Sequence, residues 1–260
     1  MLRPRIIPCL LVRNKGLVKT VKFGPSKYVG DPINAVKIFN EKEADELIVL
    51  DIDATATGAP PDFVMIQKLA AECRMPLCYG GGVKTVEQAK RIIGLGVEKV
   101  AISSAALANP TIITAIATEI GSQSVVVVID VRKSLFGKYE VYTDNGQKGT
   151  GRTPVEVAQE AANLGAGEIV INSINCDGQI KGYDIELARK VRAATRLPMT
   201  MVGGAGSLAD IGHLISACGV VGAAAGSLFV FKGSYRAVLI SYPSQLQKEE
   251  LIRTALGTPR

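Results

Sequence analysis

Leu197-Pro-Met-Thr-Met-Val-Gly-Gly-Ala-Gly-Ser207 reads as a short buried strand that runs into a glycine-rich turn and then into a helix. The same order of residue types appears earlier, at Met75-Pro-Leu-Cys-Tyr-Gly-Gly-Gly-Val83. In each copy the helix is followed by a second apolar strand and a second small-residue turn, Ser103-Ser104-Ala105-Ala106 or Ala225-Gly226-Ser227. The two copies lie about half a chain apart, which predicts an internal repeat.

The glycine turns predict phosphate binding. Glycines between a strand and a helix let backbone N–H groups approach an anion, and the positive end of the helix dipole adds to the attraction. Glycine can also occur at such a junction only because it turns the chain tightly. Two copies in matched contexts favour the phosphate interpretation. The predicted contacts are Gly82, Ser103 and Ser104 at the first site, and Gly204, Gly206, Gly226 and Ser227 at the second.

Composition narrows the class of protein. The 260 residues, 47% of them hydrophobic, can bury one large core, and no linker divides the chain. The net charge of +6 comes from scattered lysines and arginines, which argues against nucleic-acid binding and favours acidic small molecules. Residues 214–231 carry no charge but contain glycines and serines, so we assign them to helix, strand and turn rather than to a membrane span.

Cysteine and histidine usage predicts neither a cofactor nor a metal site. The five cysteines form no Cys-x-x-Cys pair, which indicates a reducing cytosol. The first five residues lead directly into a strand and lack the apolar core of a signal peptide, so a cytoplasmic location is expected. His213 is the single histidine, which argues against a Ser-His-Asp or Cys-His catalytic centre.

Apolar runs rich in valine and isoleucine alternate with helical patterns, as is typical of parallel strands covered by helices. Strands are predicted at residues 5–11, 46–52, 76–79, 98–103, 124–130, 168–172, 198–202 and 220–225. Helices are predicted at residues 32–44, 62–72, 85–95, 110–120, 154–164, 185–194 and 208–217, with a last one within 233–256. These units predict a single-domain (β/α)8 TIM barrel over residues 1–260, with half-barrels at about 1–121 and 122–260. The alternative, a doubly wound open sheet, lacks its Gly-x-Gly-x-x-Gly motif after the first strand.

A barrel sorts the polar residues by position, because its chemistry lies at the C-terminal ends of the strands. The C-terminal ends hold Leu11, Asp51, Asp130, Asn172, Asp177 and the glycine turns, while Arg5, Glu46, Lys99 and Glu168 begin separate strands at the opposite end. Residues 12–31, rich in lysine, predict a mobile basic lid after the first strand. Residues 131–152 predict a small hairpin around an Asp-Asn-Gly turn.

Motifs along nearly the whole chain follow one known pattern. They include Arg5-Ile-Ile-Pro-Cys-Leu10, Gly30-Asp-Pro32, Leu50-Asp-Ile52, Tyr79-Gly-Gly-Gly82, Ile129-Asp130, Asp177-Gly178, Gly182-Tyr-Asp184 and Gly203-Gly-Ala-Gly206. In these motifs the chain resembles HisF, the cyclase subunit of imidazole glycerol phosphate synthase. The resemblance implies a barrel that docks a glutaminase, HisH, on its N-terminal face and passes ammonia through its centre. At the C-terminal face, the family uses that ammonia to cleave a bis-phosphorylated aminoimidazole carboxamide ribotide and close an imidazole ring.

The resemblance also implies roles for individual residues. Two catalytic aspartates are expected, at the ends of strands one and five; Asp130 occupies the second position, but Leu11 occupies the first. Contact with a phosphorylated substrate is expected for Lys19, Asp51, Asn172, Asp177 and Gly178 as well as for the glycine turns. A gate for ammonia is expected from Arg5, Glu46, Lys99 and Glu168, which could instead form a salt-bridge ring that only closes the barrel. Asp51 likewise has a structural alternative, because an aspartate after a strand often holds a loop through its backbone amides.

Three positions depart from the family pattern: Leu11 replaces aspartate, Asn172 replaces the usual threonine, and Val202 replaces the usual serine. A leucine cannot exchange protons, so ring closure would have to proceed with one carboxylate. These departures and the ending Tyr235-Arg-Ala-Val-Leu-Ile-Ser-Tyr-Pro243 resemble a divergent HisF branch of surface-polysaccharide pathways. In that branch a HisH-like glutaminase and a sugar amidotransferase are the implied partners, and ammonia turns a sugar N-acetyl group into an acetamidino group.

Three other functions remain open from the sequence. The first is the ordinary cyclase of histidine biosynthesis. The second is a scaffold without chemistry of its own, which the retained phosphate turns argue against. The third is another sugar-phosphate lyase or isomerase that uses Asp130 and Asp51 as its acid and base.

Overall fold

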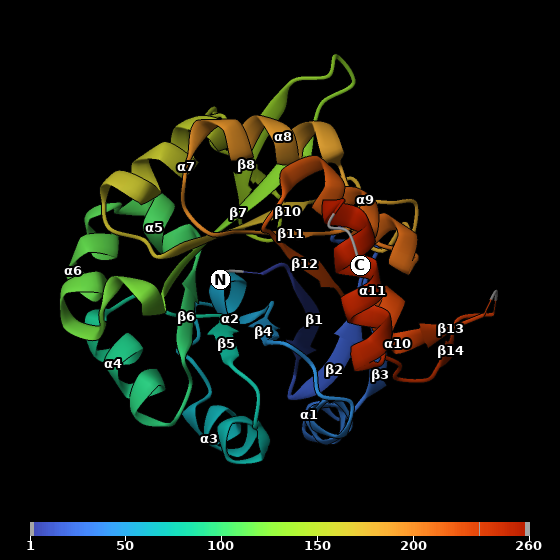
Figure 1. Ribbon diagram of the computed structural model, residues 1–260. Helices are drawn as coiled ribbons and strands as arrows, with labels where there is room; N and C mark the ends of the chain where they lie inside the picture. Colours follow the sequence, from blue (N-terminus) through green and yellow to red (C-terminus); the bar gives the residue numbers. More distant parts are fainter. Residues whose placement is uncertain (1–2, 234, 258–260) are drawn as a thin grey trace.

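The computed structural model describes residues 3–233 and 235–257, so the first two residues of the segment expected to lead into strand one lie outside it. Its centre is a closed barrel of parallel strands (Figure 1). The barrel strands are β1 (Arg5–Arg13), β4 (Leu47–Asp51), β5 (Leu77–Gly80), β6 (Lys99–Ile102), β7 (Val125–Lys133), β10 (Glu168–Ser173), β11 (Met199–Val202) and β12 (Gly222–Ala225). Pairing of β1 with β12 closes the barrel, which confirms the predicted (β/α)8 fold and excludes the open sheet.

The strand register gathers the predicted C-terminal residues on one rim. Asp130 of β7 lies opposite Asn172 of β10, and Asn172 in turn lies opposite Val202 of β11. Leu11 of β1 lies opposite Leu50 of β4. Because all eight strands run in the same direction, residues that end different strands meet around one mouth.

Eight helices form a ring around the barrel (Figure 1). They are α1 (Pro32–Glu41), α3 (Phe63–Glu72), α4 (Val86–Gly94), α6 (Thr111–Ile120), α7 (Pro154–Asn163), α8 (Ile185–Ala194), α9 (Leu208–Cys218) and α11 (Gln245–Leu256). Most begin at a side chain that accepts a hydrogen bond from the first turn, as Asp31 does for α1 and Thr85 for α4. Such caps satisfy N–H groups that have no partner within the helix.

Short helices that the sequence pattern did not predict follow three of the strands. They are α2 (Ala54–Thr57), α5 (Ser104–Ala108) and α10 (Ser227–Val230). The helices α5 and α10 follow the fourth and eighth barrel strands, β6 and β12, so they lie four units apart in the barrel. A 3-10 turn, η1 (Ser122–Ser124), precedes β7.

The hydrophobic core has two parts, one on each side of the barrel wall. The larger part lies between strands and helices and contains fully buried Tyr79, Phe39 and Leu47. The smaller part fills the barrel interior, and all eight strands contribute to it: Ile7, Cys9, Ile48, Cys78, Ala101, Val126, Val128, Val170, Val202 and Ala224. Leu11 and Leu50 pack on this inner cluster at its C-terminal side. The barrel centre is therefore a packed apolar layer below the mouth.

Residues 12–31 differ from the expected mobile lid. Strand β1 continues to Arg13, and β2 (Gly16–Lys19) and β3 (Lys27–Gly30) extend the sheet by antiparallel pairing. Only the segment between β2 and β3 is irregular, and Lys19 is buried rather than exposed. Strand β2 does not alternate between buried and exposed residues: Leu17, Val18 and Lys19 are all buried.

The expected hairpin after strand five forms, and it is larger than predicted. Strand β7 extends to Lys133 and pairs with β8 (Tyr139–Thr143), which then pairs with β9 (Lys148–Gly149) across the Asp-Asn-Gly turn. A second hairpin, β13 (Phe231–Lys232) with β14 (Ala237–Val238), follows α10 and projects from the barrel (Figure 1).

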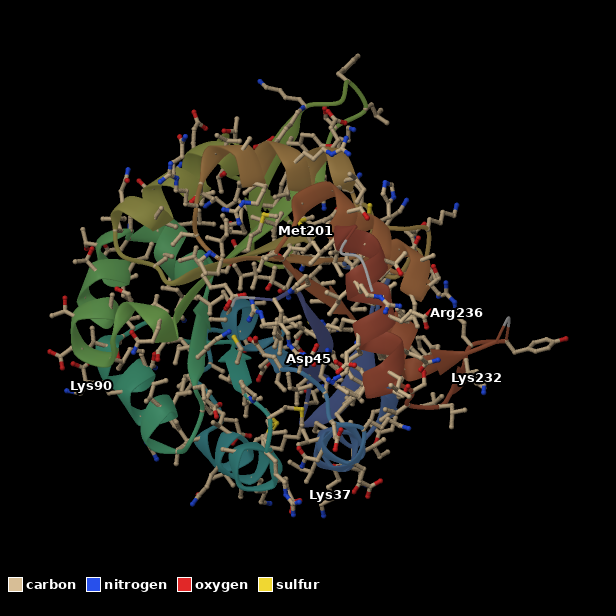
Figure 2. All side chains as sticks on the ribbon, viewed as in Figure 1. Lys37, Asp45, Lys90, Met201, Lys232 and Arg236 are labelled. Atoms are coloured by element: carbon tan, nitrogen blue, oxygen red, sulfur yellow. The ribbon has the colours of Figure 1, made fainter. Side chains whose placement is uncertain are left out.

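Charged side chains are spread over the outside of the barrel, as Lys37, Lys90 and Lys232 show in Figure 2. The Asp45 side chain, by contrast, is almost fully covered. The Asp45 carboxylate accepts hydrogen bonds from the Ile6 N–H (2.9 Å) and from Lys248 Nζ of α11 (2.8 Å). This buried pair fastens the last helix to the first strand. Among the helices of the described residues, none combines the length and the apolar character needed to cross a membrane.

Candidate functional site

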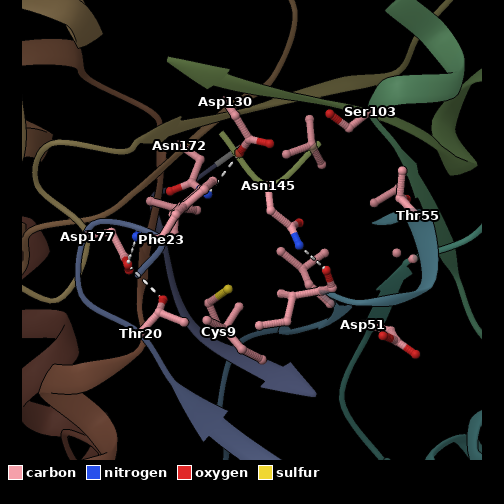
Figure 3. Close-up of a pocket in the computed structure, with 18 of the residues that line it drawn as sticks. Cys9, Thr20, Phe23, Asp51, Thr55, Ser103, Asp130, Asn145, Asn172 and Asp177 are labelled. Atoms are coloured by element: carbon pink, nitrogen blue, oxygen red, sulfur yellow. Dashed lines mark hydrogen bonds between the residues drawn. The ribbon is translucent and has the colours of Figure 1, made fainter. Parts of the chain in front are cut away.

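A cavity of about 490 Å³ opens at the C-terminal ends of the strands (Figure 3). Nearly all residues that the sequence predicted for this end line it: Leu11, Lys19, Asp51, Gly82, Ser103, Ser104, Asp130, Asn172, Asp177, Gly178, Gly204, Gly226 and Ser227. Gly206 is the exception. The fold therefore brings together residues that are more than 200 positions apart in the chain.

Asp130 and Asn172 form a hydrogen-bonded pair in the cavity (Figure 3). Asn172 Nδ2 donates to Asp130 Oδ1 at 3.0 Å. Burial raises the pKa of the Asp130 carboxyl from 3.8 to about 7; the hydrogen bond from Asn172 opposes this shift, and the nearby charge of Asp177 adds to it. Asp130 can therefore take up or release a proton near neutral pH.

The surroundings of Asp130 hold no second carboxylate at the strand-one position. Leu11 stands there, and it lines the cavity with Leu50 and Val202, which belong to the strands β4 and β11. Burial, the main cause of the raised pKa of Asp130, thus occurs in a cavity whose lining includes these apolar side chains. The strand-one position thus supplies no acid or base to pair with Asp130, although Asp51 and Asp177 also line the cavity.

Lys19 and Asp177 lie in the first and sixth units of the barrel. Lys19 Nζ donates to the Cys9 carbonyl at 2.7 Å, and burial lowers the pKa of the Lys19 ammonium. Asp177 accepts hydrogen bonds from Thr20 Oγ1 (2.8 Å) and the Phe23 N–H (3.2 Å), as Figure 3 shows. Burial raises the pKa of Asp177, and these hydrogen bonds oppose the shift. Asp177 therefore joins the segment between β2 and β3 to the loop that follows β10, whereas the Lys19 contact stays within the first unit.

Asp51 holds a loop. Its Oδ1 accepts hydrogen bonds from the Asp53 and Ala54 N–H groups at 3.0 and 3.1 Å, at the start of α2. Burial raises the pKa of its carboxyl, while the two backbone donors oppose that shift. The structural alternative for Asp51 therefore has direct support from its contacts.

The first glycine turn lines the cavity together with Ser103 and Ser104. Gly81 and Gly82 adopt φ values of +129° and +70°, which side chains other than glycine rarely accept, and a Cβ on either would come within 2.6 Å of the Asp51 or Ala59 carbonyl oxygen. Ser103 precedes α5, and its buried Oγ has no hydrogen-bond partner among the described residues. A hydroxyl and free helical N–H groups thus meet at one end of the cavity.

In the second turn, Gly204 and Gly206 both contact neighbouring protein atoms. The Gly206 N–H donates to Asp210 Oδ2 at 2.9 Å, so it is already satisfied by the cap of α9. The Gly204 carbonyl accepts from the Gly182 N–H at 2.9 Å, and a Cβ on Gly204 would collide with the Gly182 carbonyl. Close packing against neighbouring backbone requires both glycines, so an added Cβ at Gly204 or Gly206 would disturb folding.

The remaining part of the second turn faces Lys19. A Cβ on Gly226 would collide with Lys19 Nζ, which places this ammonium directly at the turn between β12 and α10. Ser227 begins α10 and lines the cavity. A cation and a helix start therefore lie together at the end of the cavity opposite Ser103 and Ser104.

At the N-terminal face, Arg5, Glu46, Lys99 and Glu168 form a closed ring of ion pairs, as their positions predicted. Lys99 Nζ lies 2.7 Å from Glu46 Oε1 and 2.8 Å from Glu168 Oε2. Arg5 completes the ring by pairing with both glutamates, and Thr200 Oγ1 donates to Glu168 at 2.6 Å. Burial alone would raise the pKa of Glu168, but Arg5 and Lys99 outweigh it and hold the pKa at about 2.

The cavity lining also includes residues that the sequence did not single out, among them Phe23 and Asn145. Phe23 lies between β2 and β3, and Asn145 lies at the Asp-Asn-Gly turn of the hairpin, where its Nδ2 donates to the Ile52 carbonyl at 2.6 Å (Figure 3). The Asp-Asn-Gly signal located the turn but carried no information about which strand it would reach. Over the described part of the chain, no group of three or more His, Cys, Asp or Glu side chains is arranged to hold a metal ion.

Comparison with known proteins assigns the family. The family profile "Histidine biosynthesis protein" matches residues 5–236. A protein of Vibrio vulnificus (strain YJ016), named "Putative imidazole glycerol phosphate synthase subunit hisF3", is 58% identical over 253 residues, which cover 97% of each chain. A Leptospira interrogans protein named "Putative imidazole glycerol phosphate synthase subunit HisF" is 56% identical over 252 residues, 96% of this chain and 99% of that protein.

The name of a third relative does not include the word "Putative". The Alkaliphilus metalliredigens (strain QYMF) "Imidazole glycerol phosphate synthase subunit HisF" is 40% identical over 229 residues, 88% of this chain and 91% of that protein. With the closed barrel and the cavity at its C-terminal rim, these matches show that the chain belongs to the histidine biosynthesis protein family and is of the HisF type.

Proposed function

We propose that this HisF-type subunit receives ammonia from a HisH-type glutaminase at its N-terminal face and delivers it to an acceptor other than the histidine-pathway substrate. The observation that carries the proposal is the floor of the cavity. Leu11, Leu50 and Val202 line it with Asp130, and no carboxylate stands at the Leu11 position. A reaction that needs aspartates at the ends of both strand one and strand five has only Asp130 here, because Leu11 holds the other position.

The interior of the barrel suits the passage of a small neutral molecule. The side chains between the ion-pair ring and the cavity are apolar or cysteine, from Ile7 and Ile48 to Val128 and Ala224. Neutral ammonia loses little on entering such surroundings, whereas an ammonium ion would lose its hydration. The ring of Arg5, Glu46, Lys99 and Glu168 stands at the entrance and would have to rearrange for ammonia to pass.

The acceptor we propose is a phosphorylated small molecule, and for the pathway we propose the amidation of a surface-polysaccharide sugar with the help of a sugar amidotransferase. Two features support an anionic ligand: the start of α5 at Ser103 and Ser104, and the Lys19 ammonium at Gly226. The replacement of aspartate by Leu11 and the departures at Asn172 and Val202 support a reaction different from ring closure.

The competing function is the cyclase of histidine biosynthesis, to which the same phosphate turns would apply. The purified protein, given free ammonia and the bis-phosphorylated aminoimidazole carboxamide ribotide, separates the two. General acid–base assistance is worth roughly a hundred- to ten-thousandfold per group. We therefore expect a cyclase rate lower by that factor than the rate of the Alkaliphilus metalliredigens HisF.

A gain of cyclase activity on Leu11→Asp, or on its combination with Asn172→Thr and Val202→Ser, would show that these positions removed the older activity. A wild-type cyclase rate equal to that of the Alkaliphilus metalliredigens HisF would overturn the proposal. Glutaminase docking is measured separately, by stimulation of glutamine hydrolysis when the barrel is added, and does not depend on the acceptor.

A further inference from the structure

The hairpin β8–β9 places its turn over the cavity, and one side chain spans the mouth. Asn145 Nδ2, on the turn after β8, donates to the carbonyl of Ile52, which follows β4 on another side of the barrel. The bond is 2.6 Å long and joins residues 93 positions apart. In Figure 3, Asn145 lies between one group of cavity residues, which includes Asn172, Phe23 and Asp177, and another, which includes Ser103, Thr55 and Asp51.

The turn is held in place by further contacts. Arg132 Nη2 donates to the Gly146 carbonyl at 2.6 Å. A Cβ on Gly146 would come within 3.1 Å of both Phe23 and Ile174, so the turn packs against the segment between β2 and β3. Asn145 itself has a φ of +54°, a conformation that asparagine tolerates better than most residues. The sequence of the turn therefore suits a defined position over the mouth.

In Figure 3, Asn145 is drawn between Ser103, at one place where an anion can be held, and Cys9. The Cys9 carbonyl accepts the hydrogen bond from Lys19 Nζ, which lies at the other place, beside Gly226. A single small anion can reach either place without crossing the line between Asn145 and Ile52. A ligand with an anionic group at each end has to cross it.

We propose that Asn145 is a releasable strap: it stays bonded to the Ile52 carbonyl until a ligand that occupies both anion sites displaces it. This inference rests on the proposed function, since a barrel that conducts ammonia has to limit its escape until the acceptor is bound. It names Asn145 as a residue that selects for ligands with two anionic groups. One neutral hydrogen bond corresponds to a closed-to-open preference of roughly two- to tenfold, so the strap can be released by ordinary ligand contacts.

The test compares one-anion and two-anion probes on the full chain. Inorganic phosphate is the first probe, and ribulose 1,5-bisphosphate, a sugar with a phosphate at each end, is the second. The variant Asn145→Gly removes the amide and keeps the left-handed backbone that the position requires. The matched control is Gln147→Ala, because Gln147 is a second amide on the same turn and its side chain makes no hydrogen bond within the described residues.

We expect Asn145→Gly to raise the affinity for ribulose 1,5-bisphosphate by roughly two- to tenfold in calorimetry, and to leave the phosphate affinity unchanged. Gln147→Ala should change neither. Equal gains for both probes, no gain for the bisphosphate, or a bisphosphate that fails to bind the glycine variant at millimolar concentration would each overturn the strap. None of these measurements needs the glutaminase or an ammonia acceptor, so the strap and the proposed function can fail independently.

Discussion

The two ends of the barrel differ in whether their buried polar groups have partners. At the N-terminal face, every charge of Arg5, Glu46, Lys99 and Glu168 is paired with at least two partners. At the C-terminal face, the buried oxygens Ser103 Oγ and Asn172 Oδ1 have no partner among the described residues, and the Asp130 carboxyl is desolvated. A face that satisfies its polar groups contributes to stability, and a face that leaves them unsatisfied has them available for a ligand.

The backbone shows the same difference. Residues in left-handed conformations other than glycine gather near the mouth, among them Lys22, Phe23, Asp144 and Asn145. A bulky residue such as Phe23 with φ of +59° is held there by its surroundings, here by the bond from its N–H to Asp177. The comparison teaches that conformational cost in this barrel is concentrated where ligands are expected to enter.

Breaking the ion-pair ring should have the largest effect. Lys99→Met leaves Glu46 and Glu168 with Arg5 as their only cation, and removing one partner of a buried pair costs about 3–5 kcal/mol of unfolding free energy. Urea unfolding at pH 7 measures this. Lys90→Met is the matched control, because its pair with Glu119 is exposed and its loss should leave the midpoint nearly unchanged.

The same variant tests the gate. With the glutaminase present, Lys99→Met should change glutamine-driven product formation while leaving the reaction with free ammonia intact. If the free energy of unfolding falls while glutamine-driven product formation stays unchanged, the ring only closes the barrel and is not a gate. If the unfolding free energy falls no further than in Lys90→Met, the comparison between the two faces would be wrong.

Neutralising Asp130 should raise the free energy of unfolding, whereas Lys99→Met lowers it. Its folded pKa is about 7 and its ordinary value is 3.8, so between these pH values the folded protein keeps a proton that the unfolded chain has lost. Stability due to this group is therefore present below about pH 4 and is lost as pH rises through 7. Asp130→Asn should stabilise the protein at pH 8 by on the order of 2–4 kcal/mol and have little effect at pH 4.

Thermal or urea unfolding of both proteins from pH 4 to pH 8 checks this prediction. A constant difference at every pH would mean that the carboxyl is not desolvated as the cavity floor suggests. A loss of stability at pH 8 would contradict the assignment of Asp130 to a site kept for function rather than for folding.

Ser103→Ala should have the smallest effect on folding and a specific effect on binding. Its Oγ has no partner to lose, so stability should not fall, whereas the affinity for inorganic phosphate should weaken by roughly two- to tenfold. Ser207→Ala is the converse control, because Ser207 caps α9 and its loss should cost about 1 kcal/mol of stability without changing phosphate binding. Calorimetry with phosphate, and crystals grown in sulfate, test both.

Much of this architecture was determined by the sequence alone. The alternation of apolar runs with helical patterns specified eight units, because strand and helix periodicities are local properties of the chain. Once a parallel barrel is inferred, the position of a residue along its strand places it at one end. For that reason the ring of Arg5, Glu46, Lys99 and Glu168, and the group around Asp130, were predictable without coordinates.

Only the tertiary structure decided how individual polar atoms are used. Burial of Lys19, the packing of Gly204 against Gly182 and the bond from Asn145 to Ile52 each depend on segments far apart in the chain that meet around the mouth. A glycine that admits an anion and a glycine that admits a neighbouring backbone have the same sequence signature. What distinguishes them is which atom lies closest in space, and no local pattern of residues contains that information.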